Sequence, residues 1–399
     1  MSHCERTCSD RAFEKPPGHG ENSISRPIVD MASSCELQGV FCTPAGAEKP
    51  VITASGEMIF SNLFPDARVN STARDTPVTD IRPGPSPIAG KFHTVGAQII
   101  GPDGKAFVPE GINDSDAQGA VYSTVQIAEM AQQGANTLRV FVSADSLVVG
   151  SHAQQELQQQ MAAADANKMA IILTYSPNPT GGANTTGQVL SGAELTKAEH
   201  TLSTLAKTYK DSSNVWLDTM NESGSWEKPV DPAWLTEQKA LIGAIRSIGN
   251  KSIIVMDDSK LGQGATAGED PKKGSGLTAY AKELEAAAGG NLVGDVHVYQ
   301  TGPTATDTPH IKAALEAIQN AGMPALIGET GLWPSEAANN GMMASFAAAN
   351  SLKTKAGVLV WPDASIHNRY VSSIMDKGSS ETAPYANEVL RQWNLNRHV

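Results

Sequence analysis

NTLRVFVSADSLVVGSHAQQELQQQMAAADANKMAIILTY, residues 136–175, contains two short apolar runs separated by a longer polar segment. The runs at its ends, NTLRVFV and AIILTY, are rich in β-branched residues and have the length of buried strands. The segment at 152–167, HAQQELQQQMAAADAN, has the length and composition of a helix. A strand, a crossover helix and a second strand form the unit from which parallel sheets are built.

The same alternation continues in both directions along the chain. Further strands are predicted at residues 107–112, 215–221, 252–258, 292–299, 325–329 and 357–361, and helices at 123–134, 231–249 and 309–322, each ending at a glycine. With the two strands above the count is eight, which predicts an α/β fold of the (β/α)8 TIM barrel type. A doubly wound open sheet shares this alternation. The barrel is favoured because the count closes at eight and no glycine-rich phosphate-binding turn follows the first strand.

A β-hairpin is predicted immediately before the barrel. VGAQIIGPDGKAFVPEGIN, residues 95–113, carries apolar residues on two arms around Asp103-Gly104, and the second arm runs into the first predicted strand. An apolar hairpin at this place would plug the N-terminal end of the barrel.

The N-terminal part of the chain has a different composition. Ten of the 23 prolines precede residue 91, and few apolar residues there recur at helical or strand spacing. We therefore predict a loosely ordered, Pro-rich segment at 1–90 and a barrel domain at 91–399. All four cysteines lie in the N-terminal segment, at Cys4, Cys8, Cys35 and Cys42. Two disulfides or a zinc site are conceivable, but the spacing matches no standard metal motif, which favours incidental thiols.

Charge and hydropathy exclude several classes of partner. The chain of 399 residues has a formal net charge of −12, whereas nucleic acids and anionic membranes are bound through clustered Lys and Arg. No apolar stretch approaches the roughly 18 to 20 residues that span a bilayer. The first thirty residues hold no apolar core of a secretory signal, although this does not establish a cytoplasmic location.

Chemistry in a (β/α)8 barrel is performed at the carboxyl ends of the strands. Those ends carry a recurring set of polar and aromatic residues, namely Arg139, Tyr175, Asn221, Glu222, Asp257, Asp258, His297, Tyr299, Glu329 and Trp361. Each of them alone is more often an ion-pair, capping or packing residue. Two glutamates converging on one cleft are nevertheless the equipment of glycoside hydrolysis, in which one donates a proton and the other attacks or activates water.

Five segments resemble the core motifs of glycoside hydrolase family 5, a family of clan A (β/α)8 glycosidases. They are GANTLRVFV (134–142), NVWLDTMNESG (214–224), VGDVHVYQ (293–300), PALIGETGLW (324–333) and GVLVWPD (357–363). The resemblance covers about residues 92–365 and is most similar to bacterial β-mannanases and cellulases.

The resemblance implies a role for each matching residue. Glu222 corresponds to the acid/base and Glu329 to the nucleophile. Asn221 corresponds to the residue that bonds the sugar 2-hydroxyl. The remaining matches are Arg139 and Tyr299 beside the nucleophile, His297 as a neighbour of substrate or acid/base, and Trp361 as an aromatic platform.

The sequence also departs from the family pattern. Tyr175 and Ser176 end the third strand where the family has a histidine, and Ser223 replaces the proline of the usual Asn-Glu-Pro. Aromatic residues make up only 5% of the chain, and Trp226 and Trp333 are the remaining candidates for flanking sugar subsites.

We therefore expect a retaining, endo-acting glycoside hydrolase of β-1,4-linked polysaccharide, of the mannan or cellulose type. The resemblance implies polysaccharide or oligosaccharide as the partner, no cofactor and no metal, and we expect a monomer. Because the expected substrate is a polysaccharide, we expect the protein to act outside the cell.

Two alternatives remain open. One is a carbohydrate-binding protein that has lost turnover, as Tyr175 suggests. The other is a metal-dependent or phosphate-binding barrel enzyme using Asp257, Asp258 and the run 113–116, although no His-x-His string accompanies them.

Overall fold

The computed structural model describes residues 51–52, 58–59, 90–114, 122–177, 187–266, 270–299, 307–332, 336–362 and 383–395. The chain divides into two units, residues 1–75 and 76–399. The first unit contains a two-stranded antiparallel sheet of β1 (Val51–Ile52) and β2 (Met58–Ile59). The four cysteines and Trp333 lie outside the described residues. The predicted domain boundary at residue 90 stays a prediction.

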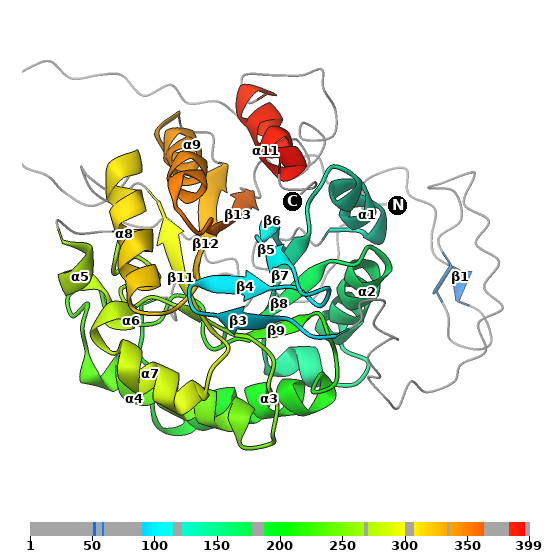
Figure 1. The fold of residues 1–399 in the computed structure, drawn as a ribbon. Coiled ribbons are helices and arrows are strands. Elements are labelled where there is room, and N and C mark those ends of the chain that lie inside the picture. Colours follow the sequence, from blue (N-terminus) through cyan, green and yellow to red (C-terminus); the bar gives the residue numbers. More distant parts are fainter. Residues whose placement is uncertain are drawn as a thin grey trace, which may run out of the picture. The chain divides into compact units, whose positions relative to one another are not determined.

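The second unit is a closed barrel of eight parallel strands, as predicted (Figure 1). In chain order its strands are β6 (Glu110–Asp114), β7 (Thr137–Val142), β8 (Ala170–Tyr175), β9 (Val215–Asp218), β10 (Ile254–Asp257), β11 (Leu292–Val298), β12 (Ala325–Leu332) and β13 (Gly357–Pro362). The ring closes where β13 pairs with β6. One strand was predicted wrongly, because Pro109 interrupts the stretch 107–112 and Phe107 pairs in a separate sheet.

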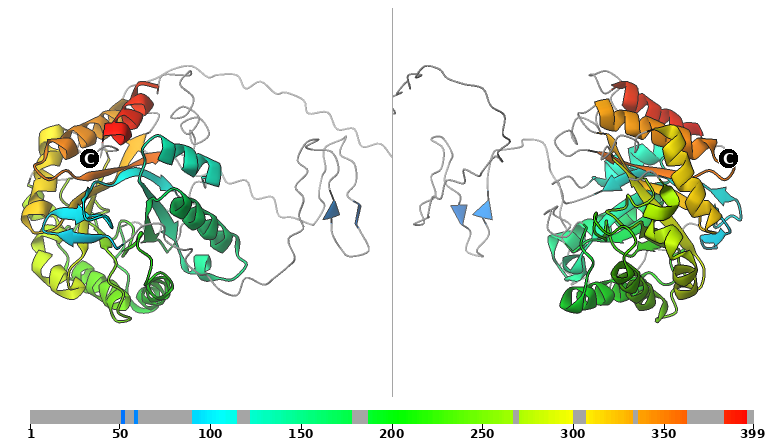
Figure 2. Two further views of the ribbon diagram at one scale, coloured as in Figure 1. Left: turned by 45° about the vertical axis from the view of Figure 1, so that its right-hand side comes forward. Right: turned by 90° about the vertical axis from the view of Figure 1, so that its left-hand side faces the viewer.

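The helices lie around the outside of the barrel (Figures 1 and 2). They are α1 (Thr124–Gln132), α2 (His152–Ala166), α3 (Gly192–Thr208), α4 (Pro232–Arg246), α5 (Pro271–Gly274), α6 (Gly276–Ala279), α7 (Ala281–Ala288), α8 (Thr308–Asn320), α9 (Glu336–Ser351) and α11 (Ala383–Leu395), with a 3-10 turn at Ala144–Leu147. The four helices predicted above are among them. Among the described residues, no helix is both long and apolar enough to cross a membrane.

A small antiparallel sheet closes the N-terminal end of the barrel, as the predicted hairpin required. Its strands are β3 (His93–Val95), β4 (Gln98–Ile100) and β5 (Ala106–Phe107). Phe92 and Phe107 make edge contacts with Trp216 of β9, with ring centroids 5.2 and 6.0 Å apart. These rings join a buried cluster with inward-facing residues of β8, β10, β11, β12 and β13. This apolar plug leaves only the opposite end of the barrel for polar chemistry.

The close approach of β6 to β7 requires a glycine. A Cβ on Gly111 would lie 1.7 Å from the main-chain oxygen of Thr137, which cannot move without breaking the barrel. We expect Gly111→Ala to lower the free energy of unfolding by about 2 kcal/mol or more. Gly243→Ala is the matched control, since Gly243 lies on the exposed side of α4 with open space around its Cα, and it should stabilise the helix by up to about 1 kcal/mol. Equal urea-unfolding midpoints for the two variants would contradict this explanation.

Candidate active site

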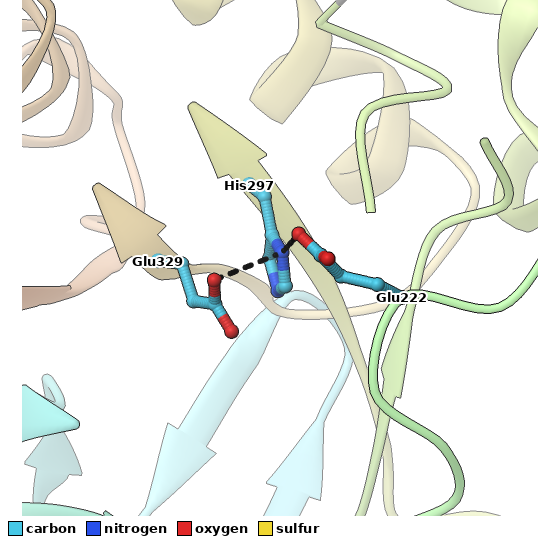
Figure 3. A group of neighbouring side chains, drawn as sticks. All are labelled: Glu222, His297 and Glu329. Atoms are coloured by element: carbon cyan, nitrogen blue, oxygen red, sulfur yellow. Dashed lines mark hydrogen bonds and ion pairs between the residues drawn. The ribbon is translucent and has the colours of Figure 1, made fainter. Parts of the chain in front are cut away.

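Glu222 and Glu329 meet at the open end of the barrel on either side of one imidazole (Figure 3). Nδ1 of His297 lies 2.9 Å from Oε1 of Glu222 and 3.4 Å from Oε2 of Glu329. Glu329 belongs to β12 and His297 to β11, whereas Glu222 follows β9. Because parallel strands end at the same rim, residues more than a hundred positions apart in sequence face one another.

Both oxygens of Glu329 receive a hydrogen bond. The guanidinium of Arg139 donates from Nη1 to Oε1 at 2.6 Å, and the hydroxyl of Tyr299 donates to Oε2 at 2.8 Å. Two donors from different strands fix the rotamer of this side chain. Held in this way, its carboxyl oxygens are the atoms that could attack an electrophilic carbon.

Arg139 is buried at the centre of the site. Its Nη2 donates to Asp218 at 3.0 Å and to both oxygens of Asp257 at 3.2 Å, and its side chain is fully inaccessible to solvent. The carboxylates raise the pKa of Arg139 well above its usual value, although burial alone would lower it. On its outer side the guanidinium lies 4.9 Å from the centre of the Phe141 ring. One cation thus links carboxyl groups from β9, β10 and β12.

Glu222 occupies a different environment from Glu329. Burial raises the pKa of the Glu222 carboxyl, and the charges of Glu329 and Asp257 raise it further, while the hydrogen bond with His297 lowers it. Its main chain is left-handed, with φ of 49°. Two main-chain contacts hold it there: its N–H donates to Oδ2 of Asp257 at 2.9 Å, and its carbonyl accepts from Gly187 N at 2.8 Å. The two glutamates therefore differ in their surroundings: the pKa of Glu222 is raised, whereas both oxygens of Glu329 accept hydrogen bonds.

The three buried aspartates of the site differ in pKa. Burial and the charge of Asp257 raise the pKa of Asp218 to about 7, and the same two causes raise that of Asp295 well above its usual range. Burial acts on Asp257 in the same direction, but Arg139 and His297 outweigh it and hold its pKa well below the usual range. Asp257 is therefore the aspartate of the three whose charged form is most favoured.

His297 is fixed by the loop after β10. A Cβ on Gly262 would lie 2.6 Å from Cγ of His297, so the loop main chain packs directly on the ring. The main-chain N–H of His297 donates to Gly262 O at 2.7 Å, and Thr266 Oγ1 donates to the carbonyl of His297 at 2.8 Å. Burial lowers the pKa of His297, but the charges of Glu329 and Asp257 outweigh it and leave that pKa well above its usual value.

Most residues singled out from the sequence come together here. Asn221 accepts a bond from Arg139 at 3.2 Å, and Trp361, half-buried at the end of β13, makes an edge contact with Phe141 at 5.3 Å. Trp226 is 40% exposed, and the ammonium of Lys260 lies 4.3 Å from the centre of its ring.

The structure corrects the interpretation of Tyr175 as a substrate contact. Side chains alternate along β8, so Thr174 points inward and donates to Asp218 at 2.9 Å, whereas Tyr175 points outward into the core beneath the helices. Burial, with a contribution from Glu194 of α3, raises the pKa of the Tyr175 hydroxyl to about 12. The residue that suggested lost turnover is therefore not part of the site.

Several residues of the site were missed from the sequence. Asn113 donates to the carbonyl of Gly328 at 2.8 Å and accepts from Arg139 at 3.2 Å. Asp218 accepts from Arg139, Asp295 accepts from the main-chain N–H of Gly328, and Phe141 lies beside Arg139. For Phe141 and Asp295 the available signal was a spacing of two residues from Arg139 and from His297 on the same predicted strand, which places them on the same interior face.

Two groups of these side chains are close enough together to be considered as metal ligands. Glu222, His297 and Glu329, and also Asp257, Asp295 and His297, each offer ligand atoms within 4.8 Å of one another. His297 belongs to both groups, and direct ion pairs among these side chains explain their closeness. The pair Asp257 and Asp258 is divided by strand alternation. Asp258 accepts from the main-chain N–H groups of Ser259, Ala265 and Leu277 on the loop side.

Both the sequence and the structure of this chain are similar to those of known glycoside hydrolases. The sequence model of the family described as Cellulase (glycosyl hydrolase family 5) matches residues 102–362. Among solved structures, the mannanase catalytic domain from Streptomyces sp. SirexAA-E superposes with a TM-score of 0.54 at 23% identity, covering 69% of this chain and 81% of that one.

Two other solved structures show the same fold. The β-mannanase from Thermomonospora fusca gives a TM-score of 0.53 at 22% identity, over 69% of this chain and 84% of that one. A triple mutant of an endo-β-1,4-glucanase from Xanthomonas axonopodis pv. citri gives 0.54 at 17% identity, over 72% of this chain and all of that one. A search of curated protein sequences found no match.

Proposed function

Because this chain belongs to glycosyl hydrolase family 5, we propose that it is a retaining endo-glycosidase that cleaves β-1,4-linked mannan or glucan chains. Residues 91–399 form its catalytic domain in this proposal, with Glu329 as nucleophile and Glu222 as acid/base. The substrate is a polysaccharide or a long oligosaccharide, which implies action outside the cell.

The separation of the two glutamates carries the proposal. One oxygen of Glu222 and one of Glu329 lie within 4.8 Å of each other. Inverting glycosidases need roughly 6.5 to 9.5 Å between their carboxyl groups to admit a water molecule, whereas retaining enzymes place them about 5 to 5.5 Å apart. The shorter separation supports direct attack by Glu329 on the anomeric carbon.

The contacts of each glutamate agree with a two-step reaction. Glu329, oriented by Arg139 and Tyr299, bonds to the anomeric carbon while the proton of Glu222 passes to the departing glycosidic oxygen. Glu222, now a carboxylate, takes a proton from water, and the resulting hydroxyl displaces Glu329. Each cycle consumes one water and restores both protonation states.

The choice of sugar rests on the comparisons and on the aromatic rim. The named neighbours include a Thermomonospora fusca β-mannanase in complex with mannohexaose and an endo-β-1,4-glucanase. Trp361 at the end of β13 is the proposed platform for the sugar at the cleavage point, and the exposed Trp226 is proposed for a flanking subsite.

Reducing-sugar release by the purified chain tests the proposal directly. The panel contains galactomannan, glucomannan, carboxymethylcellulose, xylan and β-1,3-glucan, with Glu222→Gln and Glu329→Gln as blanks. We expect release from a β-1,4-mannan or glucan that both blanks abolish and that EDTA leaves unchanged, since no step uses a metal. Binding of oligosaccharide without release from any polymer would instead indicate a carbohydrate-binding protein without turnover. Loss of activity on chelation would indicate a metal-dependent reaction.

A further inference from the structure

Asp257 contacts three residues of the site, namely Glu222, His297 and Arg139. Its Oδ2 accepts the main-chain N–H of Glu222 at 2.9 Å and lies 3.3 Å from Nε2 of His297, and both of its oxygens accept from Arg139 at 3.2 Å. We propose that Asp257 is a positioning residue that holds the proton of the acid/base on the line between Glu222 and His297. This inference deepens the proposed function and rests on it.

The first step concerns the ring of His297. Asp257 lies at the end of β10, almost completely buried beside the guanidinium of Arg139. A carboxylate only accepts hydrogen bonds, so the imidazole nitrogen that faces it carries a hydrogen. The contact of 3.3 Å lies outside good hydrogen-bond geometry and acts as an ion pair, yet it still selects Nε2 as the protonated nitrogen.

The second step concerns the other nitrogen. With Nε2 protonated, Nδ1 faces Oε1 of Glu222 at 2.9 Å, and a single proton on that line belongs either to the carboxyl group or to the ring. Glu222 can give this proton to a leaving oxygen from the first state, and the imidazolium stabilises the Glu222 carboxylate in the second. The ring thus offers the acid/base a place to hold its proton before that proton is transferred to the leaving oxygen.

The third step concerns the main chain of Glu222. A non-glycine residue at φ of 49° needs compensating contacts, and the bond from Glu222 N to Asp257 is one of two that hold this conformation. Asp257 therefore sets the position of both ends of the proton line. A single ionised group acts on the ring through Nε2 and on the carboxyl group through its main chain.

The charged groups around this line all act on the same proton. They are Arg139 from β7, Asp218 and Glu222 from β9 and its end, Asp257 from β10, Asp295 and Tyr299 from β11 and its end, and Glu329 from β12. Asp218 and Asp295 are the aspartates whose pKa values are raised, so Asp257 supplies the fixed negative charge behind the ring. Removing that charge lowers the proton affinity of Glu222 and of His297 alike.

The test compares Asp257→Asn with Asp258→Asn across the pH range. Asparagine keeps the shape of Asp257 and can still accept the Glu222 N–H, but it removes the charge. We expect the alkaline limb of the kcat/KM profile to move to lower pH by about one unit, with kcat reduced by roughly 10-fold or more. Asp258→Asn is the matched control, because Asp258 is equally buried at the adjacent position yet bonds main-chain N–H groups and the side chain of Ser275 rather than Glu222, His297 or Arg139, and its limb should stay in place.

A second readout does not depend on turnover. Nitrogen NMR of the His297 ring, assigned by loss of its signals in His297→Gln, should show a protonated Nε2 in the unaltered chain and in Asp258→Asn, and a changed tautomer or a lower pKa in Asp257→Asn. Asp257→Ser, which is smaller and removes the same charge, replaces Asp257→Asn if that variant does not fold.

The possible outcomes distinguish a failure of the proposed function from a failure of the proposed role of Asp257. If the chain hydrolyses no polymer but shows the expected ring signals, the proposed function is contradicted, while the role of Asp257 in setting the tautomer of His297 is still supported. An active chain in which Asp257→Asn loses rate without moving the alkaline limb, and with an unchanged His297 tautomer, overturns the inference and makes Asp257 purely structural.

Discussion

Replacing Glu329 by glutamine should lower kcat/KM on the best polysaccharide by about 10³-fold or more, with little change in the thermal unfolding midpoint. Glutamine has nearly the same size; its amide oxygen can still accept from Arg139, and its NH2 group can donate to the Tyr299 hydroxyl, but its neutral amide cannot form the glycosyl ester. The measurement is initial-rate reducing-sugar release beside a thermal melt of the same preparation. A residual rate within a few-fold of the unaltered chain would remove Glu329 from the role of nucleophile.

A small anion distinguishes the two glutamates. In Glu329→Ala, azide can enter the vacated space and attack from the face opposite the leaving group, which yields a glycosyl azide of inverted anomeric configuration. In Glu222→Ala, azide instead intercepts the glycosyl ester on Glu329 and yields a product of retained configuration. NMR of the azide products identifies the anomers. The reverse assignment of configurations would exchange the proposed roles of Glu222 and Glu329.

Replacing Arg139 by methionine should destabilise the chain by about 3 to 5 kcal/mol at neutral pH, because it leaves buried carboxylates without their common cation. Asp218 and Asp257 are at most 1% exposed and Glu329 is 5% exposed, so water cannot substitute for the guanidinium. Activity should fall as well, since Arg139 donates to Oε1 of Glu329.

The destabilisation should depend on pH with a definite sign. In the unaltered chain Arg139 helps to lower the pKa of Asp257, so its contribution is present above the unfolded value near 4 and is lost as pH falls through the folded value. In Arg139→Met the same carboxyl becomes harder to ionise when folded, which lowers stability as pH rises. The difference in unfolding free energy should therefore grow from about pH 4 to pH 7.

Arg246→Met is the matched control for this pH dependence. Arg246 is half-buried, and its guanidinium donates to the main-chain carbonyls of Ala288, Asn250, Ser252 and Gly290 rather than to carboxylates. The stability lost in Arg246→Met should depend much less on pH from 4 to 7, since these partners do not titrate and Glu285 acts on Arg246 through its charge rather than through a direct ion pair. Parallel pH profiles for the two variants in urea unfolding would contradict the ion-pair explanation for Arg139.

The amino-acid sequence by itself determined the architecture of the barrel. Eight short β-rich runs separated by helical segments predicted the closed parallel sheet, and the apolar hairpin around Asp103-Gly104 predicted the plug at its N-terminal end. The carboxyl ends of parallel strands share one rim, so the sequence alone predicts that Glu222, His297 and Glu329 lie close together. Strand limits were less predictable: the first barrel strand begins at Glu110 rather than at Phe107, because Pro109 has no N–H for the ladder.

Only the tertiary structure decided which side chain of each strand end faces the site. A shift of one residue exchanges the inner and outer faces, and the closed barrel settled that Thr174 and Asp257 point inward while Tyr175 and Asp258 point outward. The same holds for protonation, because identical carboxyl groups acquire different pKa values only from burial and from charges on other strands. Local sequence can place an aspartate at a strand end, but the distant Arg139 and His297 lower the pKa of Asp257, while burial raises that of Asp295.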